Sequence, residues 1–97
     1  MPEEGFVGDS VSYFATVGIA SAQAMAPRSK RKGVHFTNTS ANTISLSTRA
    51  PAVLNSGVTL LPGGVYYEPD HRYRVWDGAW FAIAGGITSN LAIKEDL

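Results

Sequence analysis

The stretch "SGVTLLPGGVYYEPD", residues 56–70, decides between two classes of fold. A phosphate-binding loop needs a strand, then a glycine-rich turn carrying lysine with Ser or Thr, and then a helix. Here no lysine follows the glycines, and "VYY" at 65–67 has the β-branched and aromatic residues typical of a strand. The stretch therefore predicts a corner between two strands, where Pro62 presets φ and Gly63 or Gly64 supplies a positive φ.

Segments with period-two alternation recur along the rest of the chain. Residues 11–19 place every second side chain on one face, namely Val11, Tyr13, Ala15, Val17 and Ile19. Residues 34–39 and 43–48, separated by polar turn residues, predict a hairpin. Residues 79–85 are nearly continuously apolar and predict a strand buried on both faces, and residues 91–96 predict a last strand.

Two further segments carry local signals. Asp77-Gly78 between apolar runs predicts the type I′ turn of a hairpin, with Trp76 and Trp80 on either side. Ala20–Ala26 suits a short helix by composition, but Pro27 ends it and a single helical turn is marginal in water. We favour an extended segment there and leave a helix open.

These signals together predict about six to eight short strands at intervals of roughly ten residues, without a long helix. The fold class is therefore all-β, a compact antiparallel β-sandwich or a jelly-roll-like barrel. Residues 1–10, "MPEEGFVGDS", predict a flexible N-terminal arm, and residues 11–97 predict a single domain.

Composition narrows the classes of function. The 97 residues carry eight basic and eight acidic side chains, so net charge favours neither nucleic acid nor a membrane surface. Charged residues make up 16%, below a typical share of about 25%, and hydrophobic residues make up 44%. A small domain with this composition is expected to cover part of its surface with another protein. The absence of cysteine excludes disulfides, thiolate zinc sites and thiol nucleophiles.

The sequence also lacks signals for a membrane. Its apolar runs are far shorter than the ~20 residues of a membrane span. The N-terminal residues lack the basic start and apolar core of a signal peptide, so we expect synthesis in a cytoplasm without general export.

No catalytic or metal-binding pattern emerges. The two histidines, His35 and His71, are not matched with a serine or threonine in a nucleophile-elbow context. Glu68, Asp70 and Asp77 are close enough in sequence to suggest paired carboxylates, but a few loop acids are common in any small β protein. The chain is therefore predicted to be non-enzymatic, with no cofactor and no metal site.

The basic run Arg28–Lys32, "RSKRK", allows three interpretations. It can be a solvated turn that protects a sheet edge, a docking site for an acidic protein surface, or a phosphate-binding patch. No aromatic residue interrupts the run, so stacking on nucleic-acid bases is not supported.

Aromatic residues crowd into positions 66–81, namely Tyr66, Tyr67, Tyr73, Trp76, Trp80 and Phe81. Adjacent tyrosines in a strand point to opposite faces, so one of the pair at 66–67 is expected to leave the core. Exposed Tyr and Trp are frequent anchors of protein interfaces. A sugar-binding platform and ordinary core packing are the competing interpretations.

The order of motifs resembles a known family. "ASAQAMAP" at 20–27 precedes "RKGVHFTNTSANTISLST" at 31–48, "LPGG" at 61–64 precedes an aromatic, and "AWFAIAGG" at 79–86 precedes a polar turn and "LAIKED" at 91–96. Over residues 11–96 this succession resembles the small all-β structural proteins of tailed-bacteriophage virions, of the capsid decoration or cement type. The resemblance implies a β-sandwich or jelly-roll-like fold, no catalysis, and assembly on the virion.

We therefore expect a protein made in the cytoplasm of the bacterial host that binds the major capsid protein on the outside of the virion. It is expected to be a homo-oligomer, a trimer by analogy with the local three-fold symmetry of a capsid. The predicted contact residues are Glu3, Glu4, Phe6, Arg28, Lys30, Arg31, Lys32, Tyr66, Tyr67, Trp76 and Trp80.

Two alternatives stay open. The first is a sugar- or receptor-binding module of a tail fibre or spike, using Tyr66, Tyr67, Trp76 and Trp80. The second is a nucleic-acid role for Arg28–Lys32, which we consider unlikely because of the zero net charge.

Overall fold

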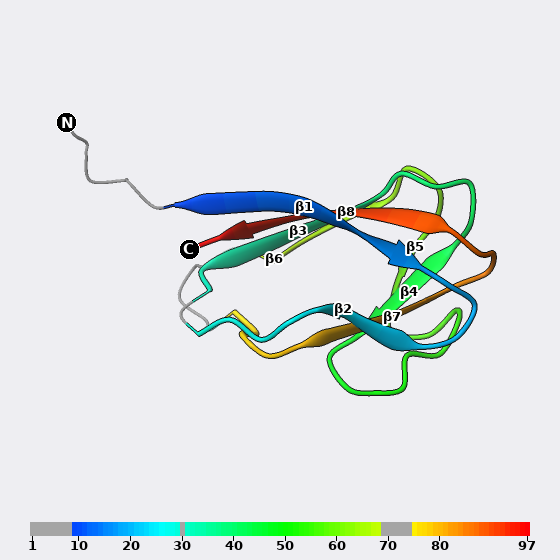
Figure 1. Ribbon diagram of the computed structural model, residues 1–97, viewed down its shortest axis with the longest axis horizontal. Helices are drawn as coiled ribbons and strands as arrows, with labels where there is room; N and C mark the ends of the chain where they lie inside the picture. The colour runs from blue at the N-terminus through cyan, green and yellow to red at the C-terminus, as the bar shows by residue number, and fades with distance from the viewer. Residues whose placement is uncertain (1–8, 30, 69–74) are drawn as a thin grey trace.

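The computed structural model describes residues 9–29, 31–68 and 75–97, which form eight strands in two antiparallel sheets and contain no helix. The first sheet has the order β1 (Ser10–Val17), β8 (Ser89–Asp96), β3 (Gly33–Asn38) and β6 (Val65–Glu68). The second has the order β2 (Ala22–Met25), β7 (Trp80–Ala84), β4 (Ile44–Ser47) and β5 (Val58–Leu60). Figure 1 shows the two sheets as stacked layers, with β1 and β8 in one and β2 and β7 in the other.

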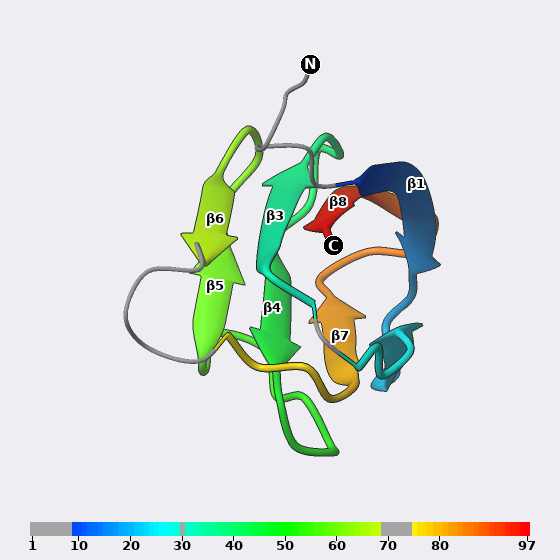
Figure 2. The ribbon, with the colours of Figure 1, turned by 90° about the vertical axis from the view of Figure 1, so that its left-hand side faces the viewer.

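The strand pairing is nested. β1 pairs with β8, β2 with β7, β3 with β6 and β4 with β5, so the chain forms one long antiparallel ribbon that turns back between β4 and β5. Two further pairs, β3 with β8 and β4 with β7, wind this ribbon into two four-stranded sheets. This is the topology of a jelly roll, and it confirms the predicted fold class. Figure 2 shows the wound ribbon from one end, with β6 and β1 at opposite margins.

The hairpin predicted for residues 34–39 and 43–48 is wrong in its pairing. Both strands form, but β3 belongs to the first sheet and β4 to the second. The side chain of Asn38 is the local cause. Its amide nitrogen donates to the carbonyls of Asn42 (2.6 Å) and Leu60 (2.8 Å), and its oxygen accepts from the backbone of Ser40 (3.0 Å). These bonds hold the link as a corner that crosses between the sheets instead of a hairpin turn.

The Pro-Gly-Gly corner between β5 and β6 is confirmed. The Gly64 N–H donates to the Leu61 carbonyl at 2.7 Å, which closes a four-residue turn with Pro62 in its second position. Gly63, in the third position, has a φ of +82°, the conformation that a type II turn requires there. Gly63 is therefore the residue that supplies the positive φ, and a side chain at this position would be strained.

The core lies between the two sheets and is built from alternating side chains. Among its fully buried residues are Phe36, Ile44, Leu46, Leu91 and Ile93. Trp80 packs edge-on against Phe36 with ring centroids 5.1 Å apart, and Tyr66 approaches Trp80 at 6.0 Å. Tyr66 therefore faces the core, and the neighbouring Tyr67 faces outward, as the alternation predicts.

Three local predictions differ from the structure. Asp77 and Gly78 do not have positive φ, so the predicted type I′ hairpin does not form there. β7 is buried on one face only, because Phe81 and Ile83 on its other face are half-buried. Ile19 lies beyond the end of β1 and is exposed instead of facing the core.

Two boundary questions are also answered. Ala20–Ala26 contains the strand β2, so the extended form is correct and the helix is not. The last residues of the predicted N-terminal arm belong to the first sheet, since Ser10 begins β1 and the Asp9 carbonyl accepts from the Leu97 N–H at 2.8 Å. The rest of the arm, 1–8, lies outside the described residues.

Candidate functional site

The outer face of the first sheet carries exposed apolar side chains in cross-strand rows. One row runs through Phe14, Ala92, Thr37 and Val65, and the next through Ser12, Lys94, His35 and Tyr67. Phe14, Val65 and Tyr67 keep 66%, 58% and 49% of their surface exposed. We call these two rows the outer face below.

The second sheet differs, because a loop of the chain itself covers part of its outer side. Between β4 and β5, the Asn55 N–H donates to the Ser45 hydroxyl at 2.8 Å, and Ser45 is fully buried. Ala52 of the same loop is buried and its N–H donates to the Ser21 hydroxyl at 2.8 Å. The first sheet, whose outer face keeps its large apolar side chains exposed, is therefore the better candidate for a binding surface.

A shallow hollow of about 200 Å³ lies on the outer face. Its lining includes the small side chain of Ala92 together with His35, Thr37 and Lys94 from the neighbouring positions. Small-molecule pockets usually enclose about 300–1,000 Å³ and bury most of their ligand. The hollow is smaller and open, so it suits one or two projecting side chains of a protein partner.

The outer face carries one stacked aromatic pair and is almost neutral. The rings of His35 and Tyr67 stack in parallel, with centroids 4.0 Å apart and planes 15° apart. Such aromatic pairs are worth about 0.5–1.5 kcal/mol beyond their buried area, so the exposed tyrosine is held in place. The Lys94 ammonium pairs with the Asp96 carboxylate at 3.1 Å, and this exposed pair contributes little to stability.

The basic run does not form the patch that the sequence suggests. The Arg31 side chain is fully buried, so its prediction as a surface contact is wrong. Its Nε donates to the Glu95 carboxylate at 2.7 Å, and its other nitrogens donate to the carbonyls of Trp76, Gly78 and Ala26 at 2.8, 3.1 and 2.8 Å. Arg31 thus joins β8 to the segment before β7 and to the end of β2.

Glu95 is the centre of this buried polar cluster. It also accepts hydrogen bonds from the Arg28 Nε at 3.0 Å and from the Tyr13 hydroxyl. Burial alone would raise the pKa of the Glu95 carboxyl, but the three donors and the charge of Arg31 outweigh burial and hold that pKa below its ordinary value. Burial and its hydrogen bond to Glu95 raise the pKa of Tyr13. Arg28's own hydrogen bond to Glu95, together with the charge of that carboxylate, raises the pKa of Arg28.

The lowered pKa of Glu95 predicts that the folded protein loses stability at acid pH, a decrease that we call the acid limb. Because the folded state holds the ionised form, its contribution is fully present above the ordinary Glu pKa of 4.5 and is lost as pH falls through the lower folded value. We expect the free energy of unfolding, measured by urea titration at several pH values, to decrease below about pH 4.5. The Glu95→Gln variant, less stable throughout, should lose that part of the acid dependence. An acid limb of equal size in both proteins would contradict this assignment.

The predicted contact residues fall into three groups. Glu3, Glu4, Phe6 and Lys30 lie outside the described residues. Arg28, Lys32, Tyr67 and Trp76 are exposed at least in part. Arg31 and Trp80 are buried, so the predicted contacts through these two are wrong for the folded domain, and Tyr66 is partly buried against the core.

The positions of the aromatic residues also test the predicted sugar-binding platform. Tyr66 and Trp80 pack within the core, so the four aromatics proposed for sugar binding do not share one surface. The sequence prediction missed Phe14 and Val65. Alternation over residues 11–19 held the signal for Phe14, because it places that ring opposite the core-facing side chains.

The described part of the chain contains no group of three or more His, Asp or Glu side chains placed to hold a metal ion. Its described residues also include no helix long and apolar enough to cross a membrane. No protein-family model, curated protein or solved structure matches the sequence or the fold of this chain. The functional conclusion therefore rests on the chemistry of the surface.

Proposed function

We propose that the chain is a non-enzymatic structural protein of a bacteriophage virion, a decoration protein that binds the outer capsid and stabilises the head lattice. The observation that carries the proposal is the outer face, where Phe14, Val65 and Tyr67 stand exposed on a nearly neutral sheet. Jelly rolls occur in viral capsid proteins, but also in lectins and cupins, so the fold alone does not assign the role.

The mechanism would be reinforcement by binding. Burying one large apolar side chain against the major capsid protein contributes about 1.5–3 kcal/mol relative to leaving it in water. A chain that contacts neighbouring capsid subunits adds this binding free energy to the assembled state only. Many copies on one lattice, or several binding sites in one oligomer, multiply the effect through avidity.

The test is occupancy on intact virus particles from the source of the sequence. The wild-type chain should co-purify in a fixed ratio to the major capsid protein, as measured by gel densitometry. Val65→Lys places a charge in the outer face and should lower occupancy about tenfold or more, because truncating or charging a buried anchor costs much of the affinity. Tyr67→Ala should act in the same direction.

Ile87→Lys provides a matched control. Ile87 is 71% exposed, but it lies in the link between β7 and β8 at an end of the barrel, away from the outer face. This variant should keep wild-type occupancy. Absence of the chain from purified particles, or equal occupancy for Val65→Lys and Ile87→Lys, would contradict the proposed role.

A sugar- or receptor-binding module of a tail fibre or spike is the second candidate. It is favoured by the exposure of Tyr67 and Trp76, the two aromatics of the proposed platform that remain at the surface. A glycan array separates the two functions, because a decoration protein should show no saccharide preference. A preference that Tyr67→Ala abolishes would support the alternative.

A further inference from the structure

The four edge strands of the two sheets are protected to different degrees. β2 has four residues and a bulge between Gln23 and Met25, β5 has three residues and is followed within two positions by Pro62, and β6 has four residues. Short strands, bulges and prolines are common devices that stop a sheet edge from pairing with another chain. These three edges are therefore poor templates for strand addition.

β1 is the exception. It has eight residues, "SVSYFATV", without charge, proline or glycine, and its register with β8 is continuous from Ser10 to Val17. Among the residues that the structure describes, no backbone hydrogen bond reaches the free edge of β1 between its first residue and Thr16. A long, uncharged and regular edge of this kind is suited to pair with another strand.

Hydrogen bonds at the start of β1 show which backbone groups face the free edge. The Asp9 carbonyl accepts from the N–H of Leu97, which directly follows β8, at 2.8 Å, so the bonding groups of Asp9 face β8. The Asp96 carbonyl, opposite Ser10, instead accepts from the Lys32 N–H on the β3 side at 2.7 Å. Bonding groups alternate along an antiparallel pair, so odd-numbered residues of β1 face β8. The N–H and C=O groups that face the free edge are those of Ser10, Ser12, Phe14 and Thr16.

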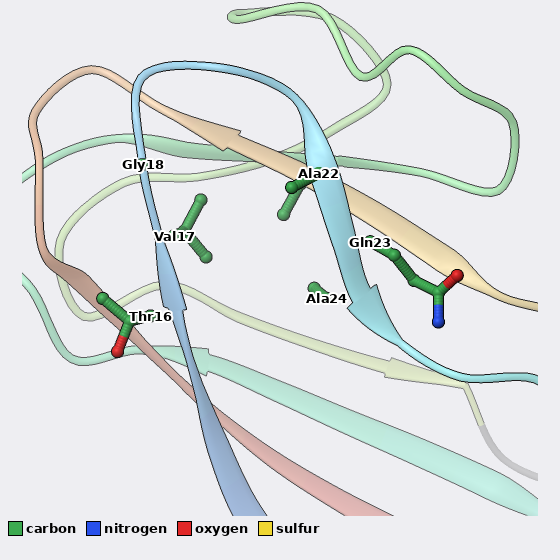
Figure 3. A pocket seen from close by; sticks show the side chains of 7 residues that line it. Thr16, Val17, Gly18, Ala22, Gln23 and Ala24 are labelled. Atoms are coloured by element: carbon green, nitrogen blue, oxygen red, sulfur yellow. The ribbon is translucent and has the colours of Figure 1, made fainter.

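Among the residues that the structure describes, β2 covers only the far end of this edge. Figure 3 shows β2 passing beside the end of β1, with Val17 projecting into the space between them and Thr16 pointing to the other side. That space is about 20 Å³, enough for a single water molecule, and the β1 residues that line it are limited to Thr16 and Val17. Figure 2 shows β1 at the margin of its sheet.

We propose that the free edge of β1 pairs antiparallel with β1 of a second copy of this chain, about a two-fold axis at Tyr13. In this register Ser12 lies opposite Phe14 of the partner, and Ser10 lies opposite Thr16. Every outward N–H and C=O group of the four residues then finds a partner, whereas a two-fold axis at Ser12 or Phe14 leaves some of them unpaired. The result is one continuous sheet of eight strands.

Three features favour a second copy over a different strand. A two-fold axis applies the same edge to itself, which is the commonest symmetry of soluble oligomers. β1 has no charged residue, so self-pairing brings no like charges opposite each other. The pairing also continues the outer face across the axis, because Phe14 and Ser12 both belong to it. The pair is two-fold, unlike the trimer expected from the sequence.

Amide hydrogen exchange of the full-length chain tests the backbone pairing directly. In a monomer the amides of Val11, Tyr13 and Ala15 are protected by β8, and those of Ser12 and Phe14 exchange quickly. In the proposed dimer both sets are protected, and light scattering gives twice the mass of one chain. A monomeric or trimeric mass at every concentration, or fast exchange of Ser12 and Phe14 in a dimer, would overturn the proposal.

Matched lysine variants locate the interface. Phe14→Lys and Val65→Lys both charge an exposed apolar position of the same cross-strand row, one on β1 and one on β6. Phe14→Lys should weaken dimerisation about tenfold or more, because it places one lysine of each chain diagonally across the axis on the same face of the joined sheet, while Val65→Lys should leave dimerisation unchanged. Equal effects of the two variants would overturn the edge pairing. Circular dichroism confirms that each variant is folded before its mass is measured.

Ser12→Pro is a second route to the same interface. The Ser12 N–H faces the free edge, so proline there removes a bond to the partner and none to β8. Loss of the dimer in a folded variant would support the proposal, and a retained dimer would oppose it. None of these outcomes depends on capsid binding, so failure here and failure of the proposed function are distinguishable.

Discussion

Replacing Arg31 with alanine is expected to lower the free energy of unfolding by about 3–5 kcal/mol, because the change leaves a buried carboxylate with one partner fewer. Three carbonyls, those of Trp76, Gly78 and Ala26, lose a guanidinium donor at the same time. A domain of this size has a total stability of about 5–15 kcal/mol, so the substitution should remove a large share of it and lower the unfolding midpoint. Urea titration followed by tryptophan fluorescence measures the loss.

Two controls separate this effect from the charge of the basic run. Lys32→Ala removes an exposed cation one residue away and should change stability by no more than about 0.5 kcal/mol. Arg31→Lys keeps the charge but not the planar fork of donors, so it should fall between alanine and wild type. Similar stabilities for Arg31→Ala and Lys32→Ala would show that the buried cluster contributes little.

A double variant tests the coupling of Arg31 with Glu95. Replacing both residues with apolar side chains, as Arg31→Met with Glu95→Leu, removes the buried charge that the single variant leaves without its buried cation. The double variant should therefore be more stable than Arg31→Ala, although the three carbonyls still lack their donor. This non-additivity is the expected mark of two residues in direct contact.

The sequence predicts the strands better than their partners. Alternation depends on neighbouring residues, so it predicts that Tyr66 and Tyr67 face opposite sides without saying which one faces the core, and the turn chemistry of Pro62 and Gly63 locates a corner. Pairing depends on residues far along the chain. Consecutive strands such as β3 and β4 lie in different sheets here, so a rule that joins neighbours through a short polar turn predicts a hairpin that does not exist.

The prediction that the basic run Arg28–Lys32 forms a surface patch is wrong for the same reason. Four cations in five residues are usually solvated, and nothing within the run distinguishes Arg31 from the others. Its partner Glu95 is 64 residues away in sequence and becomes its neighbour only because β8 pairs with β3. The exposed position of Phe14 was within reach of the sequence, since it follows from the same alternation that places Tyr13 on the core side.

The two tryptophans of "WDGAW" should respond to alanine very differently. Trp80 is buried and packs edge-on against Phe36, so Trp80→Ala should cost about 3–5 kcal/mol of stability. Trp76 is 42% exposed, and its Nε1 donates to the Ala79 carbonyl at 2.9 Å while its ring covers Gly78. Trp76→Ala should cost about 1 kcal/mol, near the centre of the distribution for point mutations, because it removes one hydrogen bond and the contact with Gly78.

Trp80→Phe refines this comparison. Within the described residues the buried Trp80 Nε1 has no hydrogen-bond partner, so phenylalanine removes a polar group that receives no compensation there. Its smaller ring leaves a cavity, and the two effects oppose each other. We expect Trp80→Phe to retain most of the stability that Trp80→Ala loses, as measured by thermal unfolding of both variants. Equal losses of stability for Trp80→Phe and Trp80→Ala would mean that the indole nitrogen is hydrogen-bonded in solution. Equal losses for Trp76→Ala and Trp80→Ala would contradict the assignment of Trp80 to the core.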